Sequence, residues 1–264
     1  MENNKKKKIK YIIFDLDGTL YEKKSVVEYY LKKFADHEGY DFYQIHESFT
    51  LAYTKASQDK YTNPAQFWSK VHDIFLKDIK SNKRRLLDSL AEKAKSKALT
   101  SIKPRPFLID LFKKIKDSGM KIIVFTGSHN MYESIHLKES DEEYRKLLIF
   151  KHKQLDLLGL SQFIDRLILT NKYGGFKPQK FVFESLLNDL KIKANECIMV
   201  GDQSNDMGAT KVDIFSVLIG NDDSKYFEPN IKIKSFKEFT DIIDFQECML
   251  KYSNLVLSPC NPPT

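Results

Sequence analysis

Short apolar runs that each end in a small, hydroxylated or acidic residue recur along the chain and limit the folds open to it. The runs cover residues 11–14, 122–125, 167–169, 198–200 and 215–219. Between them lie segments with apolar residues at helical spacing, such as 106–117 and 179–190. Uniformly apolar strands that alternate with amphipathic helices predict a parallel sheet covered on both faces, an α/β fold.

Residues 21–100 differ from the rest of the chain. They contain long amphipathic patterns, such as "SVVEYYLKKFADHEGY" and "LLDSLAEKAKSKAL", and no four-residue β-branched run. We therefore expect an inserted, mainly helical domain at 21–100 that covers the strand ends as a lid. The sheet-containing core would comprise residues 9–20 and 101–244, and residues 1–8 and 245–264 would be flexible or peripheral tails.

Composition indicates a soluble, cytoplasmic protein. The 264 residues are 42% hydrophobic, which suffices for a globular core, and the formal charge of +7 is concentrated near the start. Residues 1–10 contain five lysines and one glutamate, a charge of +4, which leaves +3 for the rest. We interpret "KKKKIK" as a solvated terminus rather than a contact for nucleic acid or a membrane. The three cysteines lack metal-ligand spacing, and no segment reaches membrane-spanning length.

Polar residues at the ends of three apolar runs predict a binding site. Asp15 and Asp17 follow the first run, Thr126 ends the second, and Asp202 follows the fourth. In a parallel α/β sheet, ligands bind beyond the carboxyl ends of the strands, so the fold itself would bring these residues together. Gly18 supports a turn that directs both neighbouring acids toward one point.

The residue types indicate phosphate chemistry with a divalent cation. Several carboxylates at one site repel one another, and a hard cation with oxygen ligands, most naturally Mg²⁺, compensates them. Asp202 and Asp206 are spaced by four, so both face inward if a helix begins there. The "FTGS" stretch offers a hydroxyl and backbone N–H groups for phosphate oxygens, and Lys177 in "YGGFKPQKF" offers a fixed positive charge. Of Asp15 and Asp17, one acid could attack while the other handles protons.

Four ordered motifs resemble those of the haloacid dehalogenase superfamily. They are "DLDGT" at 15–19, Thr126 after an apolar strand, Lys177-Pro178, and "GDQSND" at 201–206. The resemblance spans residues 11 to about 240. It implies a doubly wound, Rossmann-like sheet, and the insertion at 21–100 lies where members with a helical cap between the first and second motifs carry that cap.

The resemblance also implies roles for individual residues. Asp15 would be the nucleophile that takes the phosphoryl group as an aspartyl phosphate, and Asp17 the general acid and base. Thr126, Gly127 and Lys177 would bind the phosphoryl oxygens.

The same resemblance implies a magnesium site. Its ligands would be Asp15, Asp202, the main-chain carbonyl of Asp17 and, directly or as a support, Asp206. Dehalogenases of the superfamily lack an aspartate equivalent to Asp17 and the phosphatases have it. The sequence therefore favours a Mg²⁺-dependent phosphoric monoester hydrolase acting on a small phosphorylated metabolite, as a monomer or homodimer without membrane or nucleic-acid partners.

Two alternatives remain open at this point. A phosphomutase or phosphotransferase of the same superfamily would pass the phosphoryl group to an acceptor hydroxyl instead of water. A non-catalytic binding protein of this fold would have no need of Asp15 and Asp17 together, which argues against it.

Other residues carry less weight. His129 lacks metal-ligand spacing, so we favour a surface or packing role. Tyr61, Phe67 and Trp68 could line the substrate side of the cap, but core packing is the favoured interpretation. The segment 129–150 is longer than members of the superfamily usually need, and we expect it to extend a helix or to form a charged loop near the site.

Overall fold

The computed structural model of the protein describes residues 8–22, 26–56, 64–100, 102–127, 141–220 and 227–250. The chain divides into two compact units. The core unit consists of Met1–Glu22 with Lys103–Thr264, and the helical unit is Lys23–Ile102. Each is considered by itself below. His129 and Tyr61, which the sequence singled out, lie outside the described residues.

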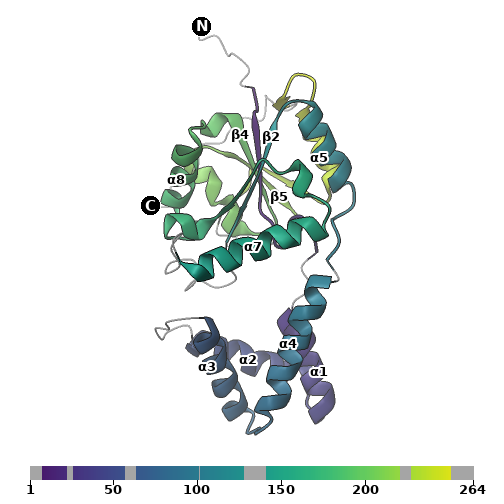
Figure 1. The fold of residues 1–264 in the computed structure, drawn as a ribbon, viewed down its shortest axis with the longest axis vertical. Coiled ribbons are helices and arrows are strands. Elements are labelled where there is room, and N and C mark those ends of the chain that lie inside the picture. Colours follow the sequence, from purple (N-terminus) through teal and green to yellow (C-terminus); the bar gives the residue numbers. More distant parts are fainter. Residues whose placement is uncertain are drawn as a thin grey trace. The chain divides into compact units, whose positions relative to one another are not determined.

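The core unit is built on a six-stranded parallel sheet in the order β3-β2-β1-β4-β5-β6 (Figure 1). The strands are β1 (Tyr11–Phe14), β2 (Lys121–Thr126), β3 (Arg166–Leu169), β4 (Cys197–Gly201), β5 (Phe215–Ile219) and β6 (Ile231–Ile233). Five of the six correspond to the apolar runs in the sequence. The predicted α/β fold class is therefore confirmed, and β1 lies at the centre, between β2 and β4.

Helices cover both faces of the sheet. They are α5 (Leu108–Asp117), α7 (Glu142–Leu157), α8 (Lys180–Leu190) and α9 (Phe236–Ile242). Successive strand residues point to opposite faces, so Ile13 packs in one cluster with Phe183 of α8, while Phe14 packs against Phe112 of α5 and Phe239 of α9. A strand buried on both faces must be apolar throughout, which explains the uniform composition of β1.

Short 3₁₀ helices and a hairpin complete the core unit. The 3₁₀ helices are η1 (Ser161–Phe163), η2 (Thr170–Tyr173), η3 (Ala194–Glu196) and η4 (Ser204–Val212). An antiparallel hairpin of β7 (Ile243–Asp244) and β8 (Met249–Leu250) follows α9. The carbonyl of Cys248 in this hairpin accepts a hydrogen bond from the N–H of Ile9, so residues 245–250 are tied to the start of β1.

Two sequence expectations fall partly on described residues. Of the segment 129–150, residues 142–150 belong to α7, so the helix is extended there, and residues 128–140 lie outside the described part. The segment 179–190 was predicted to be helical, and α8 begins at Lys180 because Gln179 has extended backbone angles.

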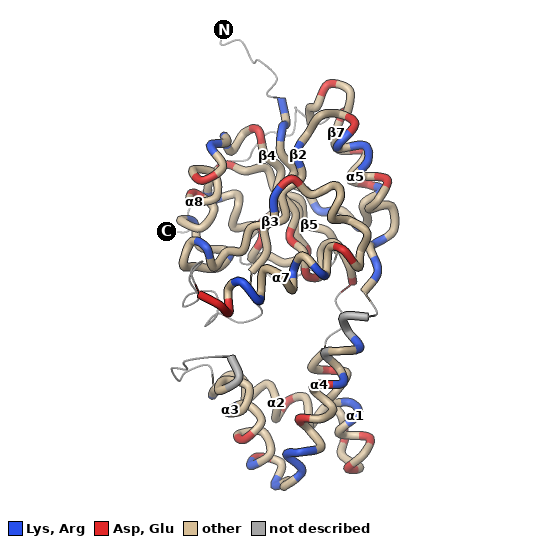
Figure 2. Tube along the Cα trace, in the orientation of Figure 1, with Lys and Arg blue, Asp and Glu red and all other residues tan. Residues whose placement is uncertain are grey.

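The helical unit contains α1 (Val26–Glu38), α2 (Phe42–Ala56), α3 (Pro64–Asp78) and α4 (Arg84–Thr100). Its buried side chains form a core separate from that of the sheet. Phe67 is buried in this core and Trp68 packs against it. In both units, acidic and basic residues are interspersed along the helices (Figure 2). Among the described residues, no helix combines the length and apolar character that crossing a membrane requires.

We predict that Phe75→Ala lowers the free energy of unfolding of the helical unit by about 3–5 kcal/mol, because it removes a fully buried aromatic ring. Trp68 is the only tryptophan of the chain and packs against the same core, so its fluorescence during urea unfolding reports this unit. Tyr43→Ala is the matched control, since Tyr43 is 80% exposed. Equal midpoints for Phe75→Ala and Tyr43→Ala would contradict the described core.

Candidate active site at the carboxyl edge of the sheet

A sharp turn after β1 places the first motif. The N–H of Asp15 still donates to the carbonyl of Val200, at 2.9 Å, so strand pairing with β4 continues up to the first acid. The chain then turns at Gly18, whose φ of +99° suits glycine. A Cβ at Gly18 would lie 2.3 Å from a carboxylate oxygen of Asp202, so the turn also needs glycine for space. The guanidinium of Arg105 holds the turn by donating twice to the Gly18 carbonyl, at 2.6 and 3.1 Å.

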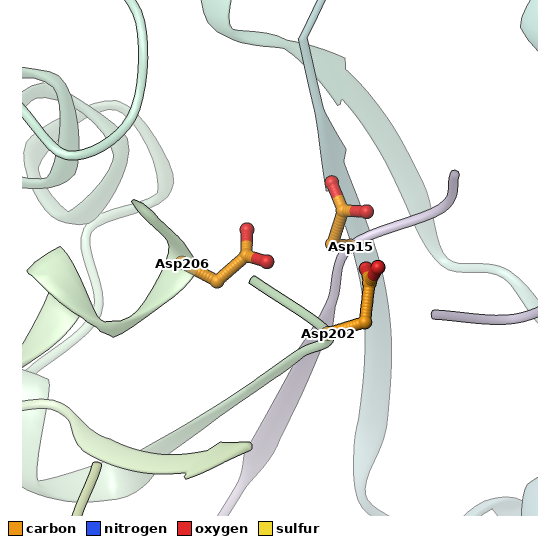
Figure 3. Close-up of side chains that lie close together, drawn as sticks. All are labelled: Asp15, Asp202 and Asp206. Carbon is orange, nitrogen blue, oxygen red and sulfur yellow. The ribbon is translucent and has the colours of Figure 1, made fainter. Parts of the chain in front are cut away.

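Three carboxylates converge beyond the ends of β1 and β4. Asp15 follows β1, Asp202 follows β4, and Asp206 lies in η4 (Figure 3). One oxygen from each lies within 4.8 Å of the others. Thr19 donates its hydroxyl to Asp202 at 2.7 Å and so fixes that side chain. The structure thus brings together three of the four acids that the sequence assigned to this edge.

A buried lysine compensates part of this charge. The Lys177 ammonium donates to Asp15 at 2.6 Å, to Asp206 at 2.5 Å and to the carbonyl of Phe125 at 3.1 Å. These bonds use all three of its donors, so its position is fixed. With three acids and one ammonium, the cluster keeps an excess of negative charge, which fits a hard divalent cation with oxygen ligands.

The pKa values of these groups follow from burial and from this charge excess. Burial is the main cause that raises the pKa of Asp15, which is about 6. The positive charge of Lys177 lowers this pKa, and the negative charges of Asp206 and Asp17 raise it further. Burial, followed by the charge of Asp15, raises the pKa of Asp202 to about 6. Burial lowers the pKa of Lys177, but the charges of Asp15 and Asp206 outweigh it, so the net shift is upward and the ammonium stays charged.

Asp17 belongs to a different set of contacts. One of its carboxylate oxygens accepts a hydrogen bond from the ammonium of Lys151, which is fully buried in α7. The other accepts from the hydroxyl of Tyr21 and from the amide nitrogen of Gln154, the latter at 3.3 Å. The two acids of the first motif therefore have separate lysine partners: Lys177 for Asp15 and Lys151 for Asp17.

Thr126 ends β2 beside Asp17, and Gly127 follows it in the chain. The buried hydroxyl of Thr126 is 3.5 Å from a carboxylate oxygen of Asp17. Gly127 approaches the hydroxyl of Thr170 closely, since a Cβ there would lie 3.1 Å from it. Both residues are thus placed at the same edge as the acids.

Sequence reasoning missed several residues of this site. They are Thr19, Tyr21, Arg105, Lys151 and Gln154. For Lys151 a signal existed: Tyr144, Leu155 and Leu158 are buried at helical spacing, and Lys151 lies on the same stripe. A lysine at an apolar position of a helix needs a buried partner. The sequence held no comparable signal for Arg105, which acts on a backbone carbonyl.

Comparisons with known proteins agree with this geometry. Residues 9–212 match the sequence model of the haloacid dehalogenase-like hydrolases. The pyrophosphatase PpaX of Halalkalibacterium halodurans is 28% identical over 163 residues, which cover 52% of this chain and 76% of PpaX.

Solved structures share the fold. The HAD-hydrolase YfnB of Bacillus subtilis, solved bound to magnesium, has a TM-score of 0.60 at 14% identity, covering 89% of this chain and 99% of YfnB. A HAD phosphatase of Thermococcus onnurineus has a TM-score of 0.56 at 20% identity, covering 90% of this chain and all of that protein. Solved dehalogenases share the fold as well, so the fold does not choose between the two reactions.

We predict that Asp202→Asn stabilises the metal-free protein at pH 7.5 by about 1–3 kcal/mol, because it removes a buried charge from a repulsive cluster. The folded chain keeps the Asp202 proton up to about pH 6, whereas the unfolded chain loses it near 3.8, so stability falls as the pH rises between these values. At pH 4.5 the gain should therefore be small. Amide hydrogen exchange in β1 and β4 during urea unfolding measures the effect.

The matched control is Asp241→Asn, which changes an exposed acid of α9. Mg²⁺ should stabilise the wild type more than Asp202→Asn. A gain of the same size at pH 4.5 and pH 7.5, or a loss at pH 7.5, would contradict the repulsion that we infer.

Proposed function

The chain belongs to the haloacid dehalogenase-like hydrolases, and from this premise we propose that it is a Mg²⁺-dependent phosphatase of a small phosphorylated metabolite. The observation that carries the proposal is the separate pairing of Asp15 with Lys177 and of Asp17 with Lys151. In this arrangement Lys177 favours the ionised form of Asp15, which attack requires. Lys151 holds Asp17 in place for proton transfer.

Asp15 is the proposed nucleophile. Lys177 favours its ionised form and would also compensate the charge of a phosphoryl group that is bound there. In the first step, an Asp15 oxygen bonds to phosphorus and the bond from phosphorus to the leaving oxygen breaks, while Asp17 donates a proton to that oxygen. In the second step, the oxygen of a water molecule bonds to phosphorus and one proton of that water passes to Asp17. The bond between phosphorus and the Asp15 oxygen breaks.

The residues that would hold magnesium are Asp15, Asp202, Asp206 and the carbonyl of Asp17. The convergence of three carboxylates supports this assignment. The ion, when bound, would neutralise charge on the transferring phosphoryl group. Thr126 and Gly127 would donate to phosphoryl oxygens from the end of β2.

Asp17 supports a phosphatase over a dehalogenase. A leaving alkoxide needs a proton and a halide does not, so an acid beside the nucleophile serves ester cleavage. The similarity to a pyrophosphatase points the same way. We further propose that the helical unit is a cap that governs entry of the substrate, because it is inserted directly after the first motif and has a core of its own.

We predict that the wild type releases inorganic phosphate from at least one compound in a screen of phosphate monoesters and pyrophosphate with Mg²⁺. Asp15→Asn should lower this activity at least about 10³-fold, because it removes the nucleophile. Asp110→Asn, which changes an exposed acid of α5, is the control. EDTA should abolish the activity, and Mg²⁺ should restore it.

The products separate the proposal from its alternatives. An isomeric phosphate ester in place of inorganic phosphate would indicate a mutase, and halide release from 2-haloacids would indicate a dehalogenase. Equal turnover by the wild type and Asp15→Asn would overturn the proposed function.

A further inference from the structure

The helix α7 carries two polar side chains into the buried part of the core unit. Lys151 has no exposed side-chain surface, and Gln154 is 3% exposed. Neither residue belongs to the four motifs on which the proposed function rests. Both lie on the buried stripe of α7, where leucines such as Leu155 pack against the core.

Both side chains converge on Asp17. Lys151 donates to one carboxylate oxygen, and Gln154 donates to the other at 3.3 Å. Gln154 also donates to the hydroxyl of Tyr21 at 2.9 Å, and that hydroxyl in turn donates to Asp17. Since both oxygens are engaged from different elements, the carboxylate cannot rotate about its last bond without breaking charge-assisted hydrogen bonds.

We propose that Lys151 is a positioning residue for Asp17 and that Lys151, Gln154 and Tyr21 form an Asp17 clamp. This inference rests on the proposed function, in which Asp17 moves protons at the phosphoryl group. Lys151 is fully buried and acts on the substrate only through Asp17.

The contacts favour positioning over simple packing. An apolar side chain at position 151 would continue the stripe of α7 without burying a charge, and burying an ammonium is costly unless its partner is placed well. The amide oxygen of Gln154 is buried and has no hydrogen-bond partner among the described residues. Burying this oxygen without a partner is costly. The two hydrogen bonds from the amide nitrogen to Asp17 and Tyr21 explain why a glutamine lies there.

The clamp should matter most for the second chemical step. Water attack on the aspartyl phosphate needs Asp17 in line to accept the proton of the water, and small displacements of such a base are costly to the rate. With p-nitrophenyl phosphate as substrate, the first step is less demanding. The bond from phosphorus to oxygen breaks and p-nitrophenolate leaves without requiring a proton from Asp17.

A rapid-quench experiment with p-nitrophenyl phosphate and Mg²⁺ tests the proposal. We expect Lys151→Met to release about one equivalent of p-nitrophenolate in a burst close to the wild-type rate of the first step. Its steady-state turnover should then fall by about tenfold or more, and covalent phosphoenzyme should accumulate. Lys151→Arg should recover part of the turnover, because it keeps a cation at the end of the side chain.

The control is Lys146→Met on the same helix, where the ammonium is exposed and pairs with Glu142 and Glu143. It should behave as the wild type. If Lys151→Met does not fold, as judged by circular dichroism, the double variant Tyr21→Phe and Gln154→Leu provides the same test. Wild-type turnover in the folded clamp variants, or an equal loss in burst and steady state, would overturn the inference.

The experiment also keeps the inference apart from the proposed function. If the wild type forms no phosphoenzyme and its turnover equals that of Asp15→Asn, the proposed function is overturned, and the inference with it. A wild type that turns over normally while Lys151→Met does the same would overturn the inference alone.

Discussion

Charge compensation at the carboxyl edge of the sheet is the constraint on which the rest of the site depends. Four aspartates lie at this edge, and burial opposes the ionisation of Asp15, Asp202 and Asp206. Two buried ammonium groups compensate part of this charge. Lys177 pairs with Asp15 and Asp206, and Lys151 pairs with Asp17. Each lysine comes from an element far along the chain from the acid it meets, so the site exists only when the core unit is folded.

The central position of β1 makes this arrangement possible. Its neighbours β2 and β4 deliver Thr126 and Asp202 to either side of Asp15, at the point where the strand order reverses. The two acids of the first motif have different lysine partners there. Asp15 faces the acid cluster and Asp17 faces α7. The two charges therefore do not compete for the same lysine, which suits the proposed roles of Asp15 in attack and Asp17 in proton transfer.

The sequence predicted those features that leave a local pattern. Uniformly apolar runs located five of the six strands of the sheet, and their polar ends located Asp15, Asp17, Thr126 and Asp202. The strand β6 was missed because its three residues alternate isoleucine and lysine, as suits an edge strand that is covered less. Lys151 lies on an apolar stripe that the sequence shows, but its contact with Asp17 could not be predicted, because the two residues are 134 positions apart and only the fold brings them together.

The identity of the residue that takes the phosphoryl group tests the account most directly. Borohydride reduces an acyl phosphate to an alcohol, so protein quenched during turnover of p-nitrophenyl phosphate and then reduced would carry homoserine wherever aspartate had been phosphorylated. Peptide mapping by mass spectrometry should find homoserine at position 15 and aspartate at 17, 202 and 206. Homoserine at any of those three positions, or its absence while phosphate is released, would contradict the assignment of Asp15 as the nucleophile.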